Sequence, residues 1–269
     1  MTVLYSKSGP VATFVIDNGK VNVFTPQMHH EFHQALVDFN RDPDIRVGIL
    51  AGSPGKSFCA GDDIRTPLPA LTPQEALEAH LSPHCHEDRI GLTRPGWEQD
   101  VMRMRRTKPI IGAVDHYCLG QGLIYLLLLT ELRVATDRAQ FGFPEIAYGM
   151  GGAGAMTRLG HVVPQAVAME MLLLGERIDA MKALSVHLVN RVVAPEQLMA
   201  EAQAMAEAIA SHPSVAVQVE LESYRRAMDM PREQAMDYAG TLFRFQRVAY
   251  DGPGAGTGFF RKQHDGARG

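Results

Sequence analysis

Short apolar runs separated by turn residues recur along the first two thirds of the chain. Runs of four to six residues that are rich in β-branched side chains predict buried strands rather than helices, which need longer periodic segments. The clearest such runs lie at residues 11–16, 47–52, 109–114 and 133–136. Strands of this kind at intervals, with helical patterns between them, are typical of an α/β domain.

Amphipathic spacing marks the helices. Apolar residues recur at helical intervals between Met28 and Asn40, and Thr25 with Pro26 is suited to begin that helix, as a cap and a first-turn residue. Further helices are predicted at residues 97–106, 165–174, 195–209 and 214–228, and one with a cap near Asp179.

Two strands lead into glycine-containing segments that could expose backbone N–H groups. After the strand at 47–52, the stretch Ser57–Ile64 bends at Gly61; after the strand at 109–114, the stretch Asp115–Gly122 leads into the apolar run Leu123–Leu129. A glycine bend can turn N–H groups into a cavity, and a helix N-terminus leaves its first N–H groups unpaired. Such donors can hold an oxyanion, although a single Gly-Asp turn is often only a turn.

Four segments together resemble the enoyl-CoA hydratase/isomerase (crotonase) superfamily, in that family's order and spacing. They are Phe58–Asp63, Ala113–Gly122, Ala139–Glu145 and Gly151–Leu159. The resemblance runs from about Val11 to Val193 and more loosely to the C-terminus. It implies an α/β fold, a spiral of repeated strand-strand-helix units at residues 1–195, and a C-terminal helical region at residues 196–269 that carries subunit contacts and part of the CoA cover. No sequence repeat reveals the spiral independently.

The resemblance implies an acyl-CoA substrate and assigns roles to individual residues. The backbone N–H groups of Asp62 and Gln121 would form an oxyanion hole for the thioester carbonyl. The residues expected to contact CoA are Ala60, Asp63, Ile64, Phe260 and Lys262. The last two lie after the glycine run 252–258, where the same residues would also fit a frayed basic tail. CoA would enter as part of the substrate, and no other cofactor is expected.

The proton-transfer residues depart from the family pattern. Hydratases of this family use two glutamates; Glu145 matches one, but the other position holds Ile124, which carries no proton. One carboxylate in an apolar pocket suits a proton shuttle along an allylic chain, so the leading prediction is a single-glutamate isomerase. Asp62 could be a displaced second acid, which keeps a hydratase open, and His116 could contribute to the pocket.

Two further functions stay open at this point. The same oxyanion hole would serve a hydrolase of a CoA thioester or of a β-diketone, because each of these reactions develops charge on a carbonyl oxygen. Since Ile124 replaces one expected acid, a catalytically silent acyl-CoA binder also fits the sequence.

Residues 65–107 are the least regular part of the sequence. His80, His84 and His86 cluster there beside Cys85, but their spacing matches no common zinc site, so no metal is expected. We interpret the segment as a variable wall of the acyl pocket. Trp97, the only tryptophan, could line that wall, although ordinary packing is the simpler interpretation.

Composition narrows the classes of protein to which this chain could belong. The chain has 269 residues with a net charge of −4, which argues against a nucleic-acid footprint. The sequence has no apolar span of twenty residues, so no membrane helix is predicted, and no signal sequence is evident at the N-terminus. The three cysteines have no zinc spacing and are expected to be free thiols of a cytoplasmic protein. The resemblance implies a homotrimer or a hexamer made of two trimers.

Overall fold

The structure, a computed structural model, describes residues 2–65, 72–75, 77, 97–151 and 158–251. The chain divides into two compact units, residues 1–210 and 211–269. The sequence placed this boundary near residue 195. The boundary lies later because helix α8 (Leu198–Ala210) packs on the sheet of the first unit through Leu198, Ala202 and Ala206.

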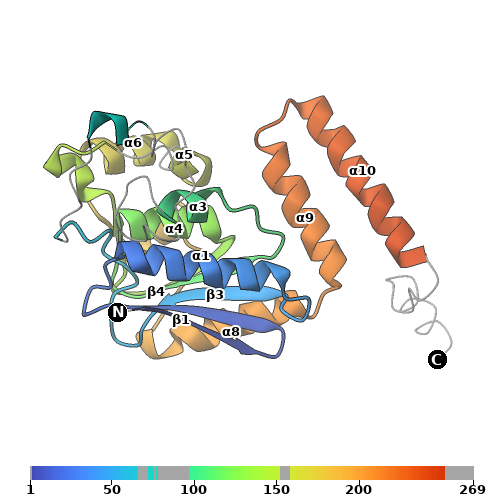
Figure 1. The fold of residues 1–269 in the computed structure, drawn as a ribbon, viewed down its shortest axis with the longest axis horizontal. Coiled ribbons are helices and arrows are strands. Elements are labelled where there is room, and N and C mark those ends of the chain that lie inside the picture. Colours follow the sequence, from blue (N-terminus) through green and yellow to red (C-terminus); the bar gives the residue numbers. More distant parts are fainter. Residues whose placement is uncertain (1, 66–71, 76, 78–96, 152–157, 252–269) are drawn as a thin grey trace. The chain divides into compact units, whose positions relative to one another are not determined.

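A six-stranded sheet forms the centre of the first unit (Figure 1). Its strand order is β1-β2-β3-β4-β6-β9, and all neighbours are parallel except the antiparallel pair β1 and β2. The strands are β1 (Thr2–Ser8), β2 (Val11–Asp17), β3 (Val47–Gly52), β4 (Ile110–Val114), β6 (Leu132–Thr136) and β9 (Arg191–Val193). The predicted strands at 11–16, 47–52, 109–114 and 133–136 are therefore confirmed.

A three-stranded sheet runs beside it in the order β5-β7-β8, with β5 (Tyr117–Leu119), β7 (Gln140–Gly142) and β8 (Ile178–Asp179). An isolated bridge between Cys59 and Cys118 extends this sheet toward the segment after β3. Twice, a strand of the larger sheet is followed by one of the smaller sheet and then by a helix: β4, β5 and α4 (Gln121–Leu129), then β6, β7 and the 3₁₀ helix η2 (Pro144–Tyr148). The predicted strand-strand-helix repeat is present here.

The larger sheet is covered by helices on both faces (Figure 1). Phe14, Ile16 and Leu50 point to a core that they share with α1 (Pro26–Arg41) and α4. Residues of the opposite alternation, such as Val47 and Ile49, pack against α8. Alternate strand residues face opposite sides of a sheet, so strands covered on both faces read as continuous apolar runs.

Helix α1 begins as the sequence predicts. Thr25 is its N-cap and accepts a hydrogen bond from the backbone N–H of Met28, and Pro26 stands in the first turn. The buried face of α1 includes Met28, His29 and Phe32. Because this helix packs on the sheet beside α4, it brings His29 next to the end of the segment that carries Gly61.

Several further helices of the first unit are short connections. They are α3 (Trp97–Arg103), α5 (Leu159–Val162), α6 (Gln165–Leu173), α7 (Ala180–Ser185) and η4 (Pro195–Gln197). The cap predicted near Asp179 is present, since its side chain accepts from the N–H of Lys182. The second unit contains α9 (Ser214–Ala227) and α10 (Arg232–Asp251). None of the described helices is long and apolar enough to cross a membrane.

Candidate active site

A cavity of about 590 Å³ opens where the two glycine-containing segments meet. This volume is in the range of pockets that hold small-molecule ligands. Its walls are contributed by the segment after β3, by β5 with the start of α4, and by η2 with the turn that follows. The lining residues are Val21, Val23, Ala60, Gly61, Asp62, Asp63, Ile64, Arg65, Tyr117, Leu119, Gln121, Ile124, Pro144, Glu145, Tyr148, Met150, Gly151 and Arg177.

Gly61 and Gly120 hold the two glycine-containing segments against each other. Both have positive φ, 112° at Gly61 and 52° at Gly120, which favours glycine because a side chain would be strained there. A β-carbon built on Gly61 would lie 3.9 Å from the backbone nitrogen of Gln121. Gln121 opens α4, where a backbone N–H has no intrahelical acceptor. Asp62, which follows Gly61, and Gln121 therefore lie at neighbouring points of the cavity wall.

Glu145 enters the cavity from η2 and lies directly against Gly120. A β-carbon on Gly120 would be only 2.1 Å from Oε1 of Glu145, so the glycine leaves the space that the carboxylate occupies. The other oxygen, Oε2, is buried and has no hydrogen-bond partner among the described residues. Burial raises the pKa of Glu145, and the nearby charge of Asp62 adds to the rise, while a backbone hydrogen bond opposes it.

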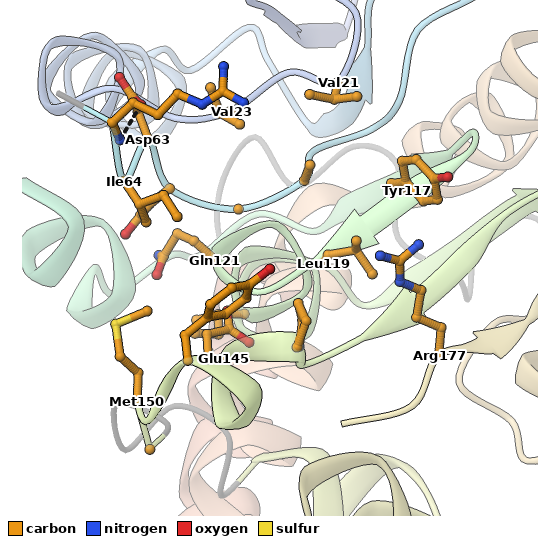
Figure 2. A pocket seen from close by; sticks show the side chains of 18 residues that line it. Val21, Val23, Asp63, Ile64, Tyr117, Leu119, Gln121, Glu145, Met150 and Arg177 are labelled. Atoms are coloured by element: carbon orange, nitrogen blue, oxygen red, sulfur yellow. Dashed lines mark hydrogen bonds between the residues drawn. The ribbon is translucent and has the colours of Figure 1, made fainter. Parts of the chain in front are cut away.

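Figure 2 shows how the other side chains surround this carboxylate. Ile64 and Met150 lie to one side of Glu145, and Tyr117 and Arg177 lie to the other. The guanidinium carbon of Arg177 is 4.9 Å from the centroid of the Tyr117 ring, in the geometry of a cation–π contact. The cavity thus has apolar side chains on one side of Glu145 and a cation, Arg177, on the other.

Asp62 also lines the cavity, and its carboxylate is held from behind by a histidine of α1. Nε2 of His29 is 3.1 Å from Oδ1 of Asp62, and Nδ1 of His29 is 2.6 Å from the hydroxyl oxygen of Tyr125 in α4. His29 and Tyr125 are 3% and 0% exposed. Burial raises the pKa of the Tyr125 hydroxyl well above its usual value, so this hydroxyl keeps its proton.

Ile124 lines the cavity as well and is buried. It stands one turn into α4, where the resembled family has its other glutamate. Glu145 therefore shares the cavity with an apolar residue of α4, Ile124, and with an acidic residue of the segment that carries Gly61, Asp62.

The predicted CoA contacts divide into two groups. Ala60, Asp63 and Ile64 line the cavity, and Oδ1 of Asp63 accepts from the backbone N–H of Arg65. Phe260 and Lys262 lie outside the described residues.

His116 is not in the cavity wall as far as the structure describes it, contrary to the pocket role considered for it. It occupies the turn between β4 and β5 with a φ of 49°, and its carbonyl accepts from Gln140. The turn requires a left-handed backbone at His116, and its carbonyl links the turn to β7. The described contacts of His116 are therefore structural.

The histidine cluster at His80, His84 and His86 lies outside the described residues. In the part of the chain that is described, no three side chains of the metal-binding types come together. Trp97 is described and packs against His30 and His33, with ring centroids 4.4 and 5.0 Å apart. This arrangement fits the simpler interpretation of Trp97 as a packing residue.

The sequence analysis missed His29, Tyr125 and Arg177. A signal for His29 was available, because it precedes Phe32 by three residues and Leu36 by seven and so lies on the apolar face of the predicted helix. A histidine on such a face is buried and needs a polar partner. Its partners come from residues 62 and 125, and no local pattern connects those positions.

Comparison with known proteins decides the family. The family model described as enoyl-CoA hydratase/isomerase matches residues 6–249. The chain belongs to the enoyl-CoA hydratase/isomerase family. The prediction of a crotonase-type chain is thus confirmed.

Similar members of this crotonase family include two curated enzymes. The chain is 32% identical to carnitinyl-CoA dehydratase of Citrobacter koseri and 33% identical to (E)-benzylidenesuccinyl-CoA hydratase of Thauera aromatica, each over 93% of both chains. A crystal structure of an enoyl-CoA hydratase subunit from Geobacillus kaustophilus superposes with a TM-score of 0.77 at 29% identity, covering 93% of this chain and 91% of that one. The predicted crotonase-type α/β fold is confirmed, and the chain is an acyl-CoA enzyme of the crotonase type.

Proposed function

We propose that this protein catalyses the reversible addition of water to an enoyl-CoA thioester, with Asp62 and Glu145 as its two proton-transfer groups. The observation that carries the proposal is that two residues with carboxyl side chains, Asp62 and Glu145, line one cavity together with Gln121. The relatives named as a dehydratase and a hydratase favour the same reaction class. Asp62 would take the part that Ile124 cannot perform.

The hydration step assigns one role to each group. The thioester oxygen accepts hydrogen bonds from the N–H groups of Asp62 and Gln121, which stabilise the enolate as it forms. Asp62 removes a proton from water, and the water oxygen bonds to C3 of the enoyl chain. The electron pair of the C2–C3 double bond moves toward the thioester oxygen, and protonated Glu145 then gives its proton to C2. Dehydration reverses each transfer, and CoA enters only as part of the substrate.

The two environments suit these opposite roles. Glu145 is desolvated and its Oε2 has no hydrogen-bond partner among the described residues, so its raised pKa favours the protonated form that donates to C2. Asp62 is paired with the ring of His29, which donates to a carboxylate and stabilises its charge. Two carboxyl groups in different surroundings, one desolvated and one hydrogen-bonded to a histidine, are a usual arrangement of an acid and a base in one site.

The test is water addition to a panel of 2-enoyl-CoA thioesters, with product formation and uptake of oxygen from isotopically labelled water as the readouts. Glu145→Gln and Asp62→Asn should each lower hydration by about 10²- to 10⁴-fold. Glu145→Gln should also abolish proton exchange at C2 of saturated acyl-CoA, whereas Asp62→Asn should retain it. Adding Ile124→Glu to Asp62→Asn should restore hydration by about tenfold or more, because it returns a proton carrier to the cavity.

Isomerisation of a 3-enoyl-CoA to a 2-enoyl-CoA is the second candidate, favoured by the apolar Ile124 and by the desolvated carboxylate of Glu145. Glu145 alone would carry the proton between C4 and C2. In that case product would form without oxygen from labelled water, and Asp62→Asn would leave the rate nearly unchanged. Turnover that releases free CoA would point instead to a hydrolase, and CoA binding without any turnover to a silent binder.

A further inference from the structure

A hydrogen-bonded chain of buried side chains leads from α4 to the carboxylate of Asp62. It runs from the hydroxyl of Tyr125 to Nδ1 of His29, and from Nε2 of His29 to Oδ1 of Asp62, over 2.6 and 3.1 Å. The three residues come from α4, α1 and the segment after β3. Of the three, only Asp62 lines the cavity.

The chemistry of the partners fixes the direction of this chain. An ionised carboxylate can only accept hydrogen bonds, so Nε2 of His29 carries the hydrogen and donates to Asp62. With a neutral ring, Nδ1 of His29 is then an acceptor. The buried Tyr125 hydroxyl keeps its proton and donates to it. Tyr125 thus selects the ring tautomer that presents a donor to Asp62.

Aromatic packing holds the histidine ring in place. The ring of His29 stacks on Phe24 at 5.0 Å with an interplanar angle of 15°. Phe24 in turn meets the edge of Tyr125 at 5.1 Å and forms a β-bridge with Asp62. One residue therefore supports all three members of the chain, which restricts the rotation of the imidazole.

We infer that His29 and Tyr125 are positioning residues that hold the Asp62 carboxylate in its working rotamer. The inference rests on the proposed hydration and identifies what makes Asp62 a competent base. A carboxylate at the edge of a cavity can rotate toward solvent. Here one of its oxygens is hydrogen-bonded to a ring whose rotation is restricted, so the carboxylate is held in one orientation.

A neighbouring histidine on the same helix provides a matched control. His30 is also buried, at 8% exposure, but its ring packs on Trp97 and its Nδ1 has no hydrogen-bond partner among the described residues. It is not part of the cavity wall described above. His30→Phe therefore makes the same chemical change at the next position without touching the Tyr125, His29 and Asp62 chain.

The experiment compares His29→Phe, His29→Gln, Tyr125→Phe and the control His30→Phe in the intact protein. For His29→Phe, kcat for hydration should fall by about tenfold or more with KM nearly unchanged, while Glu145-dependent exchange at C2 stays within about twofold. His29→Gln retains an N–H donor and should recover part of kcat. Tyr125→Phe should lower kcat less than His29→Phe, and His30→Phe should leave it unchanged.

Several outcomes would overturn the inference. Hydration and C2 exchange that decline in parallel in His29→Phe would indicate general structural damage, and unchanged hydration in a folded His29→Phe protein would remove the positioning role. If His29→Phe does not fold, nitrogen NMR of the wild-type ring still decides, because a neutral ring with its hydrogen on Nδ1 contradicts the chain. Wild-type protein that exchanges C2 protons but adds no water to any enoyl-CoA would instead defeat the proposed function itself.

Discussion

Glu145 and Gly120 make the closest approach between two segments of the cavity wall. The carboxylate occupies the space where any other residue at position 120 would carry its β-carbon. The glycine is therefore needed twice, once for its positive φ and once for the room it leaves.

Gly120→Ala should remove activity through this contact. The new methyl group would force the Glu145 carboxylate out of the position that it occupies against Gly120, and we expect C2 proton exchange to fall by about 10²-fold or more. Gly9→Ala is the control, because Gly9 has a similar φ of 55° and no atom within 4 Å of its β-carbon position. Gly9→Ala should lose about 1–2 kcal/mol of stability to backbone strain. Gly120→Ala should lose more, because Gly120 has a ψ of −124°, outside the left-handed helical region, and its new methyl group meets Glu145. Equal activity in the two variants would contradict the steric role of Gly120.

The raised pKa of Glu145 also predicts how stability depends on pH. The folded protein binds more protons than the unfolded chain once the pH exceeds the ordinary glutamate value of 4.5, so the free energy of unfolding decreases from there through the raised folded value. Glu145→Gln cannot ionise and lacks this loss. In thermal unfolding, the melting temperature of Glu145→Gln relative to the wild type should therefore be higher at pH 8 than at pH 4. A constant difference in melting temperature across that range would contradict this prediction, because it would show that ionisation of Glu145 does not lower the stability of the folded protein.

At the level of single residues, the sequence could identify groups that belong to local motifs. Glu145, Asp62 and Gln121 were found because each sits in a short segment with recognisable spacing. His29 was missed because its partners are 33 and 96 positions away in the chain, and only the packing of α1 beside α4 brings them together.

At the level of secondary-structure elements, the cap of α1 bears most directly on the site, because α1 carries His29. Thr25 ends the preceding segment and accepts from Met28, one residue before His29. The first turn of α1 thus carries both the cap contact and the histidine that holds Asp62.

Thr25→Ala should lower the free energy of unfolding by about 1 kcal/mol through loss of the cap. Thr25→Ser keeps the hydroxyl and should lose much less. Because fraying of the first turn would loosen His29, hydration should decline in the alanine variant while C2 exchange changes little. Denaturant unfolding of both variants measures the first effect, and the two activity assays measure the second. Equal stability of the alanine and serine variants would argue against the cap.

The elements that the sequence predicted are the ones with a strong period or a long apolar run. Strands β5 and β7 have three residues each, too few for a pattern to emerge. Strand β1 is an edge strand in which only Val3 is buried, so its apolar alternation is weak. The helix α10 was missed although its apolar residues gather on one face, and none of its described side chains is buried.

On the scale of the whole molecule, the second unit buries little by itself. Among its described residues only Leu221 is buried, while Phe243, Phe245 and Val248 of α10 are 54%, 69% and 70% exposed. Two helices with so small a shared core need further apolar surface to be stable.

The family resemblance implies a homotrimer, alone or paired into a hexamer, and we propose that other subunits cover this surface of α10 in it. Light scattering should give the corresponding mass at micromolar concentration. The double change Phe243→Ser with Phe245→Ser should shift the protein toward monomer, because both exposed rings leave the contact. Leu4→Ser, at an exposed apolar residue of β1, is the control and should leave the mass unchanged. A wild-type monomer would rule the assembly out.

Asp62 contributes its backbone and its side chain to the same event. In the arrangement proposed here, its N–H holds the thioester oxygen and its carboxylate faces the reacting water, whereas an acid on α4 would be an independent part. The distance between these two functions is therefore set within one residue, by its covalent geometry and by the rotamer that His29 holds. Thermal motion of the segment that carries Gly61 shifts both functions together, so their mutual alignment tolerates movements that would misalign groups held on separate elements.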